Sequence, residues 1–136
     1  MTEKLEIYRC YVCGNVIQVL NAGEGMLVCC GQAMEKAEPK YEENEMGEKH
    51  VPEIVTEHEG CEEGACYEKR FIRLDKHPMV SEHYIQFIEA YNEDKTELRI
   101  KFLNPEEKAE YEITDFRGGT KALEHCNIHG LWRNKE

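Results

Sequence analysis

The chain has 136 residues, and its 17 Lys and Arg against 28 Asp and Glu give a formal net charge of −11 at pH 7. This length predicts one modest domain with a small appendage. The acidic balance argues against nucleic acid or an anionic membrane surface as a partner, because both attract clustered Lys and Arg. No apolar run reaches the roughly 18 residues of a membrane span. The start Met1-Thr2-Glu3-Lys4 is unlike a signal peptide, so we expect a cytoplasmic protein.

Seven cysteines and six histidines are the informative counts in the composition. In a secreted small protein seven cysteines would indicate disulfides, but one would be left over. In a reducing compartment, clustered Cys and His more often bind metal. The composition therefore predicts a metalloprotein.

Residues 1–36 are expected to form a small separate domain of two or three short strands joined by glycine turns. A segment this short cannot bury enough apolar surface to fold alone, and such segments are commonly stabilised by a metal. The following residues, 37–48, are polar and acidic and include Pro39, so we expect a linker.

Four cysteines lie at the predicted turns of this domain in the pattern C-x2-C-x15-C-C: Cys10, Cys13, Cys29 and Cys30. Four thiolates that converge from two turns suit a tetrahedral zinc or iron ion. Spacing alone favours a structural zinc site. However, zinc ribbons normally end in a second spaced C-x2-C, whereas the second pair here is adjacent. The pattern therefore predicts a metal and leaves its identity open.

Residues 49–136 are dominated by two-residue alternation of apolar and polar side chains, which predicts an antiparallel β-sandwich or barrel. We expect no long helix. The segment 83–91 has apolar residues in both phases of the alternation, which indicates a central strand covered on both faces. The predicted strands are 51–57, 67–74, 83–91, 98–102, 110–114 and 121–125.

A second group of potential metal ligands lies in or beside these strands: His50, His77, His83, Cys126 and His129. Any one of these histidines alone would more often be an ordinary surface or core residue. Together they offer five donors, whereas zinc sites usually close at four. Five protein ligands and one open position suit an octahedral iron that binds a small molecule. A thiolate among them can push electron density onto the metal.

Two sets of motifs carry a resemblance to known families. Tyr8-x-Cys10-x2-Cys13-Gly14 and Leu27-Val28-Cys29-Cys30-Gly31 resemble desulforedoxin, in which four thiolates hold one iron. The later motifs E-K-H-V-P, H-P-M-x3-H-Y-I and C-N-x-H-G, in this order, resemble the desulfoferrodoxins, which are two-iron superoxide reductases. The resemblance covers nearly the whole chain.

The resemblance implies an all-β protein, with a desulforedoxin-like domain at 1–36 and an immunoglobulin-like antiparallel β-sandwich at 49–136. It implies superoxide reduction to hydrogen peroxide without release of oxygen, an external electron donor such as rubredoxin, a homodimer, and two irons per chain, with zinc possible in the four-cysteine site. The implied roles are equatorial ligation by His50, His77, His83 and His129, axial ligation by Cys126, a cation beside the open position at Lys49, and a carboxylate that caps the oxidised iron at Glu48.

Two other functions remain open on the sequence: a non-enzymatic iron electron-transfer protein, and a zinc-stabilised binding module without redox chemistry. Cys61 and Cys66 have no role in either metal site. The pair is expected to be two surface thiols, and the alternative is a reversible disulfide that senses oxidative stress. His58 and His125 are expected to be non-ligands.

Overall fold

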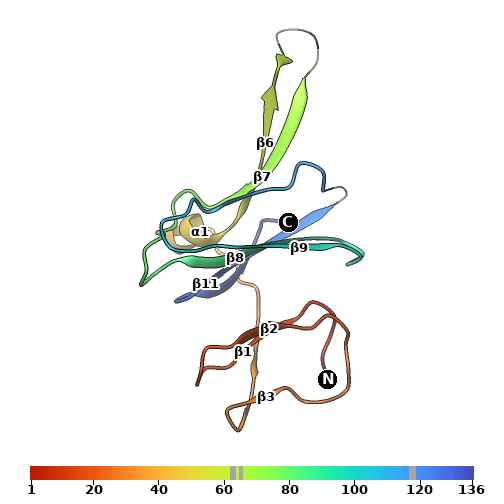
Figure 1. Ribbon diagram of the computed structural model, residues 1–136, viewed down its shortest axis with the longest axis vertical. Coiled ribbons are helices and arrows are strands. Elements are labelled where there is room, and N and C mark those ends of the chain that lie inside the picture. Colours follow the sequence, from red (N-terminus) through yellow and green to blue (C-terminus); the bar gives the residue numbers. More distant parts are fainter. Residues whose placement is uncertain (62–63, 65, 117–118) are drawn as a thin grey trace. The chain divides into compact units, whose positions relative to one another are not determined.

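A computed structural model describes residues 1–61, 64, 66–116 and 119–136 (Figure 1). The chain is almost entirely β-structure and divides into two compact units, Met1–Glu38 and Pro39–Glu136. No helix in the described ranges is long and apolar enough to cross a membrane. The expected all-β fold, with a small N-terminal domain followed by an antiparallel β-sandwich, is confirmed.

The first unit holds two small antiparallel sheets. In the three-stranded sheet, β1 (Ile7–Arg9) lies between β2 (Val16–Gln18) and β5 (Glu35–Ala37). The other sheet pairs β3 (Val28–Cys29) with β4 (Gln32–Ala33). Within residues 1–38, all of which the structure describes, the buried hydrophobic side chains are Ile7, Cys10 and Val19. So small an apolar core fits the expectation that a metal stabilises this unit.

The second unit is a sandwich of two antiparallel sheets, with strand orders β10-β7-β6 and β12-β11-β8-β9. The strand β8 lies between β11 and β9, which confirms the predicted central position of this segment. The hairpin of β6 and β7 extends beyond the sandwich (Figure 1). The elements are α1 (Glu45–His50), β6 (Glu53–Glu59), β7 (Tyr67–Arg73), β8 (Ile85–Asn92), β9 (Leu98–Phe102), β10 (Glu110–Glu112), β11 (Thr120–Cys126) and β12 (Gly130–Arg133).

The hydrophobic core of this unit lies between the two sheets. Strand alternation places Ile88 and Ala90 of β8 and Ala122 of β11 on the inner face of one sheet. Ile72 of β7 faces them from the other sheet, and Phe116 from the segment after β10 completes the packing. Because the core fixes these strands, their loop ends at one edge of the sandwich are held in defined positions.

Part of the expected linker, 37–48, is structured. Ala37 ends β5, Lys40 bridges to Trp132, and the helix α1 begins at Glu45. The side-chain oxygen of Asn44 accepts a hydrogen bond from the Gly47 N–H at 3.0 Å and caps this helix. The polar composition therefore reflected an exposed capped helix as well as a connecting segment. The short strand β12 was also not predicted, because it begins at the last residue of the C-N-x-H-G motif, which was interpreted as a loop.

Candidate metal centres

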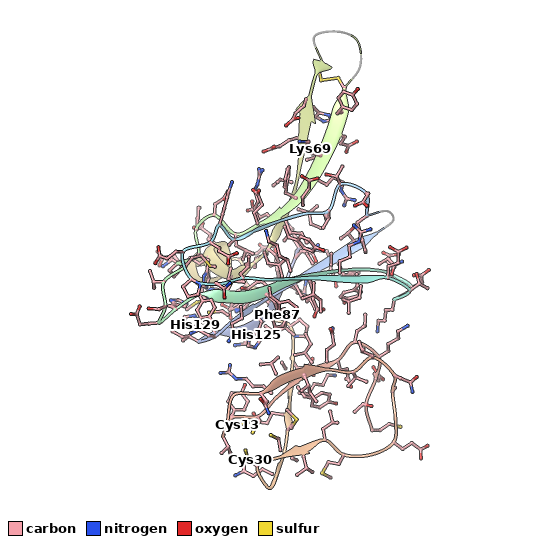
Figure 2. The ribbon with its side chains drawn as sticks, in the orientation of Figure 1. Cys13, Cys30, Lys69, Phe87, His125 and His129 are labelled. Atoms are coloured by element: carbon pink, nitrogen blue, oxygen red, sulfur yellow. A yellow bond between two sulfur atoms is a disulfide. The ribbon has the colours of Figure 1, made fainter. Side chains whose placement is uncertain are left out.

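The four cysteines of the first unit converge at two turns. Their sulfur atoms lie within 4.8 Å of one another, and Cys13 Sγ is 3.6 Å from Cys29 Sγ. Cys30 and Gly31 form the two-residue turn between β3 and β4, and both have positive φ, 53° and 72°. Such a turn matches the twist of the flanking strands. It brings the adjacent cysteine pair to the C-x2-C turn, as the sulfur atoms of Cys13 and Cys30 show in Figure 2.

The acidity of these thiols shows why a cation suits the cluster. Backbone N–H groups of Cys13 and Val12 lower the pKa of Cys10 to about 7. Hydrogen bonds with Cys13, Cys10 and Cys29 raise the pKa of Cys30 to about 12. One thiolate forms easily, and each further negative charge is opposed by those already present. Four thiolates at this spacing therefore need a bound metal ion.

The five predicted ligands of the second site come from three separate parts of the sandwich and meet at one edge. His50 is the last residue of α1, His77 and His83 lie in the loop between β7 and β8, and Cys126 ends β11. His129 lies in the turn between β11 and β12 (Figure 2). The structure therefore brings together residues that are as far apart in the sequence as 50 and 129.

The four imidazoles are arranged as the corners of a square. Ring centroids are 4.7 Å apart for His50 and His77, 4.7 Å for His77 and His83, 5.0 Å for His83 and His129, and 4.7 Å for His129 and His50. The diagonal from His50 to His83 is 6.3 Å. The ligand atoms of His50, His83, Cys126 and His129 lie within 4.8 Å of one another. His77 lies outside this group of ligand atoms, but its ring centroid is 4.7 Å from those of His50 and His83. This arrangement can surround one ion.

Hydrogen bonds orient the rings so that unprotonated nitrogens face the centre. His50 Nδ1 donates to the Met46 carbonyl at 2.8 Å, and His77 Nδ1 donates to the Pro78 carbonyl at 2.6 Å. Since a carbonyl only accepts, the Nε2 atom of each ring keeps its lone pair. The buried Nε2 atoms of His77 and His83 have no hydrogen-bond partner. Buried polar atoms left in this way fit a metal ion as their partner.

His129 presents its other ring nitrogen to the same centre. Its Nδ1 atom lies 3.0 Å from His50 Nε2 and 3.8 Å from Cys126 Sγ. The His129 backbone N–H also donates to Cys126 Sγ at 3.4 Å. The C-x2-H spacing thus places a thiol and an imidazole at one point. A mixed set of imidazole and thiolate ligands suits a transition metal such as iron or zinc.

Burial keeps these histidines neutral. It lowers the pKa of His77 to about 4, although the Pro78 hydrogen bond opposes the shift, and neighbouring imidazoles lower it further. Burial is also the main cause of the lowered pKa values of His50 and His83. At neutral pH these three rings are therefore mainly neutral, each with one unprotonated nitrogen, which is the form that binds a metal ion.

An open cavity of about 620 Å³ gives access to this cluster. Its lining includes His50, His83, His129 and Lys49, and the charge of Lys49 contributes to the lowered pKa of His83. Glu48 instead lines a neighbouring cavity of about 270 Å³, and its Oε2 lies 3.5 Å from Lys76 Nζ. The structure thus places Lys49 beside the histidines and turns Glu48 toward Lys76.

The remaining two histidines lie elsewhere. His58 is exposed on β6. His125 is buried beside Cys126, but its ring stacks on Phe87 at 5.5 Å and its Nδ1 bonds to Gln86 Oε1 at 2.7 Å (Figure 2). The prediction that neither is a ligand stays a prediction. Both have another environment in the structure.

Sequence reasoning missed two residues that support the ligand loop. The His129 carbonyl accepts hydrogen bonds from Lys40 Nζ at 3.0 Å and from Trp132 Nε1 at 3.1 Å. The Trp132 ring also stacks on His50, with centroids 4.8 Å apart. The single tryptophan of the chain, three residues after His129, was a usable signal. Lys40 lies within the polar segment, and no feature of the sequence marked it as a supporting residue.

Comparison with known proteins connects both centres to one family. A family model described as the N-terminal domain of desulfoferrodoxin matches residues 2–37, and a model described as desulfoferrodoxin matches residues 42–135. A desulfoferrodoxin homolog from Archaeoglobus fulgidus is 40% identical over 136 residues, covering 98% of this chain and 99% of the relative. A superoxide reductase from Pyrococcus horikoshii is 36% identical over 101 residues, covering 65% of this chain and 86% of that protein.

A solved structure shows the same fold. The superoxide reductase from Treponema pallidum matches with a TM-score of 0.68 at 18% identity, covering 97% of this chain and 98% of that chain. The family models match both the four-cysteine unit and the sandwich that carries the histidine ring. On this evidence, the chain belongs to the desulfoferrodoxin family.

Proposed function

We propose that the chain is a superoxide reductase, which reduces superoxide to hydrogen peroxide by one electron and releases no oxygen. One observation carries the proposal: a ring of four imidazoles with the Cys126 thiol beside an open cavity that Lys49 lines. The relative from Pyrococcus horikoshii, which bears the name superoxide reductase, supports it. The proposed iron ligands are His50, His77, His83, Cys126 and His129.

The donor set fits iron for this reaction. The five residues would hold the ion and leave room for a small molecule, and nitrogen and thiolate donors suit iron. A ferrous ion held there would supply the single electron. Superoxide, this electron and two protons together give one hydrogen peroxide. His83 and His129 are half-buried and line the cavity, so substrate and water have access from this side.

Lys49, Cys126 and Glu48 have separate proposed roles. The exposed ammonium of Lys49 attracts the small anion into the cavity of an otherwise acidic protein. The buried Cys126 thiolate donates electron density to the metal. Glu48 would supply a carboxylate to the oxidised metal, for which its side chain would have to leave Lys76. A pair of such exposed side chains is weak enough to part, since surface ion pairs contribute roughly 0–1 kcal/mol.

For the first unit we propose a second iron in the four-cysteine site, with zinc as the alternative ion. It then either relays electrons from a rubredoxin-like donor or acts as a structural ion. Exposed apolar side chains of this unit, including Tyr11, Leu20 and Met26, are available for the contact of a homodimer in the cytoplasm.

The test is rapid anaerobic mixing of the ferrous protein with superoxide. A superoxide reductase oxidises its iron rapidly, with one hydrogen peroxide formed per superoxide consumed and no oxygen evolved.

Lys49→Ala should slow this reaction at low ionic strength, by about tenfold, and weaken its dependence on salt. The matched control is Lys69→Ala, which removes the same charge from the distant β6–β7 hairpin and should keep the full rate.

Two outcomes would contradict the proposal. An iron protein that reacts slowly and gives no stoichiometric peroxide would be an electron-transfer protein. Protein that contains zinc alone, and takes up no iron under reducing anaerobic conditions, would be a binding module without redox chemistry. Metal analysis of protein purified without added metal should precede the kinetics.

A further inference from the structure

The tip of the β6–β7 hairpin carries a pair of cysteines that neither metal centre uses. Cys61 and Cys66 form a disulfide in the structure, with Cα atoms 4.4 Å apart, whereas two surface thiols were expected (Figure 2). The other five cysteines, all within the described residues, form no disulfide and lie in the two candidate metal centres. The seven cysteines therefore divide into four in the first metal centre, one in the second metal centre and two in the disulfide.

Strand pairing brings the two cysteines together. The strands β6 and β7 pair without interruption from Glu53 and Arg73 to Glu59 and Tyr67. Cys66 directly precedes Tyr67, and Cys61 follows Glu59 after Gly60, so the two cysteines lie just beyond this last pair at a Cα separation that a disulfide accepts. Since the hairpin itself holds the pair in place, two reduced thiols would stay neighbours and could rejoin within the same molecule.

The cross-link is exposed and closes a short loop. Both cysteines are exposed, and they are five positions apart in the sequence. The stabilisation that a disulfide gives by restricting the unfolded chain grows with loop length, so this one contributes at the low end of the range. Exposed disulfides of this kind are also the more easily reduced ones. The fold of the sandwich, whose core lies elsewhere, therefore does not depend on the oxidised form.

We propose that Cys61 and Cys66 are a separate two-electron redox site, which interconverts between dithiol and disulfide with a hydroperoxide as oxidant and a dithiol as reductant. In oxidation, one thiolate attacks a peroxide oxygen and breaks the O–O bond, which gives a sulfenic acid and hydroxide. The second thiol then attacks the sulfenic sulfur and water leaves. Two thiols and one hydrogen peroxide thus yield one disulfide and two waters. A small dithiol reverses the step by exchange and becomes a disulfide itself.

The charges around the pair set its reactivity. Among the described residues, Glu59 and Glu68 are acidic groups at the end of the paired strands, and Lys69 Nζ lies 3.4 Å from Glu59 Oε2 and partly offsets their charge (Figure 2). A net negative surrounding disfavours the thiolate, which is the attacking form. We therefore expect oxidation to follow sustained exposure to hydroperoxide, not brief exposure. Hydrogen peroxide is also the product of the proposed function, but the redox site does not rest on that function.

The experiment uses the full-length, metal-loaded chain. Protein reduced with dithiothreitol and desalted without oxygen is treated with hydrogen peroxide in the presence of a chelator. Free thiols are then alkylated, and the peptide that contains both cysteines is weighed. We expect this peptide to carry no alkyl group and to be two hydrogens lighter than the unalkylated dithiol peptide, and this form should appear at a rate independent of protein concentration. When native protein is returned to dithiothreitol, the peptide should again take up two alkyl groups. The single variants Cys61→Ser and Cys66→Ser should instead accumulate a sulfenic acid that dimedone traps.

Three results would overturn the proposal. Both thiols could remain alkylatable after prolonged peroxide treatment, or the disulfide could resist dithiothreitol until the protein is denatured. In addition, the double variant Cys61→Ser/Cys66→Ser should keep its full metal content and its reaction with superoxide. Loss of metal from that variant would assign the pair to a metal centre. Because the readout is the mass of one peptide, failure of the superoxide reductase proposal would leave this test intact.

Discussion

The carbonyl oxygen of His129, a proposed metal ligand, is held by hydrogen bonds from two side chains, one of which is positively charged. It accepts hydrogen bonds from the ammonium of Lys40 and the indole of Trp132, at 3.0 and 3.1 Å. The backbone of Lys40 is itself fixed, because its N–H donates to the Leu131 carbonyl at 3.0 Å. A cation is therefore held beside the peptide of a proposed ligand. A nearby positive charge favours the less positive ferrous form over the ferric form.

Lys40→Met should lower the reduction potential of iron in the histidine and cysteine site. The methionine keeps most of the apolar stem and removes the ammonium, so the ferrous form loses its electrostatic support. We expect a fall on the order of 30 mV, measured by a redox titration that follows the ferric absorption band. Lys40→Arg retains the charge and the donor and should restore most of the potential. Equal potentials in Lys40→Met and the unmodified chain would exclude this role for Lys40.

Burial of His77 predicts how stability depends on pH in the metal-free chain. Its pKa is about 4 in the folded protein, below the ordinary value of 6.5. Above pH 6.5 the ring is neutral in both states. As the pH falls below 6.5, the unfolded chain binds a proton that the folded chain refuses, so the free energy of unfolding falls until the pH reaches about 4.

Urea unfolding of the metal-free chain at pH 7.5 and at pH 5 measures this effect. For His77 we expect a loss on the order of 1–2 kcal/mol between these pH values, and His77→Gln should show a correspondingly weaker pH dependence. The lower limit of pH 5 lies above the titration of carboxyl groups such as Glu57 and Asp115, whose pKa values are lowered by Arg73 and Arg99. Identical pH dependence in the two proteins would contradict the assignment to His77.

At the level of secondary structure, the sequence predicted the positions of the strands better than the structure of the segments that connect them. The six strands predicted in the alternating region correspond to β6, β7, β8, β9, β10 and β11, and apolar residues in both phases marked β8 as central. The helix α1 was missed because it is only six residues long and carries an exposed polar face. Its signals are a single cap at Asn44 and the close approach of Gly47 to a preceding carbonyl, which depends on tertiary structure.

The candidate sites also combine features that local sequence patterns predict with features that depend on tertiary structure. Local motifs identified the cysteines and histidines, because C-x2-C, C-C and C-x2-H spacings each act over a few residues. The square of imidazoles depends on how β11 pairs with β8 and β12, which no local pattern encodes. The role of Lys40 depends on its bridge to Trp132, a contact across most of the chain length. Supporting residues of this kind need the three-dimensional structure.

Gly47→Ala tests whether α1 positions the site. A Cβ atom at Gly47 would lie 1.7 Å from the Glu42 carbonyl oxygen, so the start of the helix must shift. We expect a loss of at least about 2 kcal/mol in the free energy of unfolding. Iron occupancy of the histidine and cysteine site should fall as well, because His50 ends this helix. The control is Gly23→Ala, where no heavy atom lies within 4 Å. Full iron occupancy in Gly47→Ala would show that α1 does not position His50.

At the scale of the whole molecule, the two units differ in what stabilises them. Among its described residues, the second unit has a buried cluster of ten hydrophobic residues between its sheets. The first unit buries three hydrophobic side chains, and one of these is the thiol-bearing Cys10. Binding of a metal to four thiolates supplies folding free energy directly. The stability of the first unit should therefore depend on its metal, whereas the sandwich should fold without one.

Cys13→Ser separates these two contributions. Loss of one thiolate weakens the metal site, so local opening of residues 1–38 should become easier by a factor on the order of ten or more. Limited proteolysis should then cut within 1–38 and leave 39–136 intact, with its iron still able to react with superoxide. The matched variant Cys126→Ser makes the same chemical change in the other unit. It should abolish the superoxide reaction while residues 1–38 stay protected. If both units of Cys13→Ser were digested together, the metal of the first unit would be stabilising the sandwich as well.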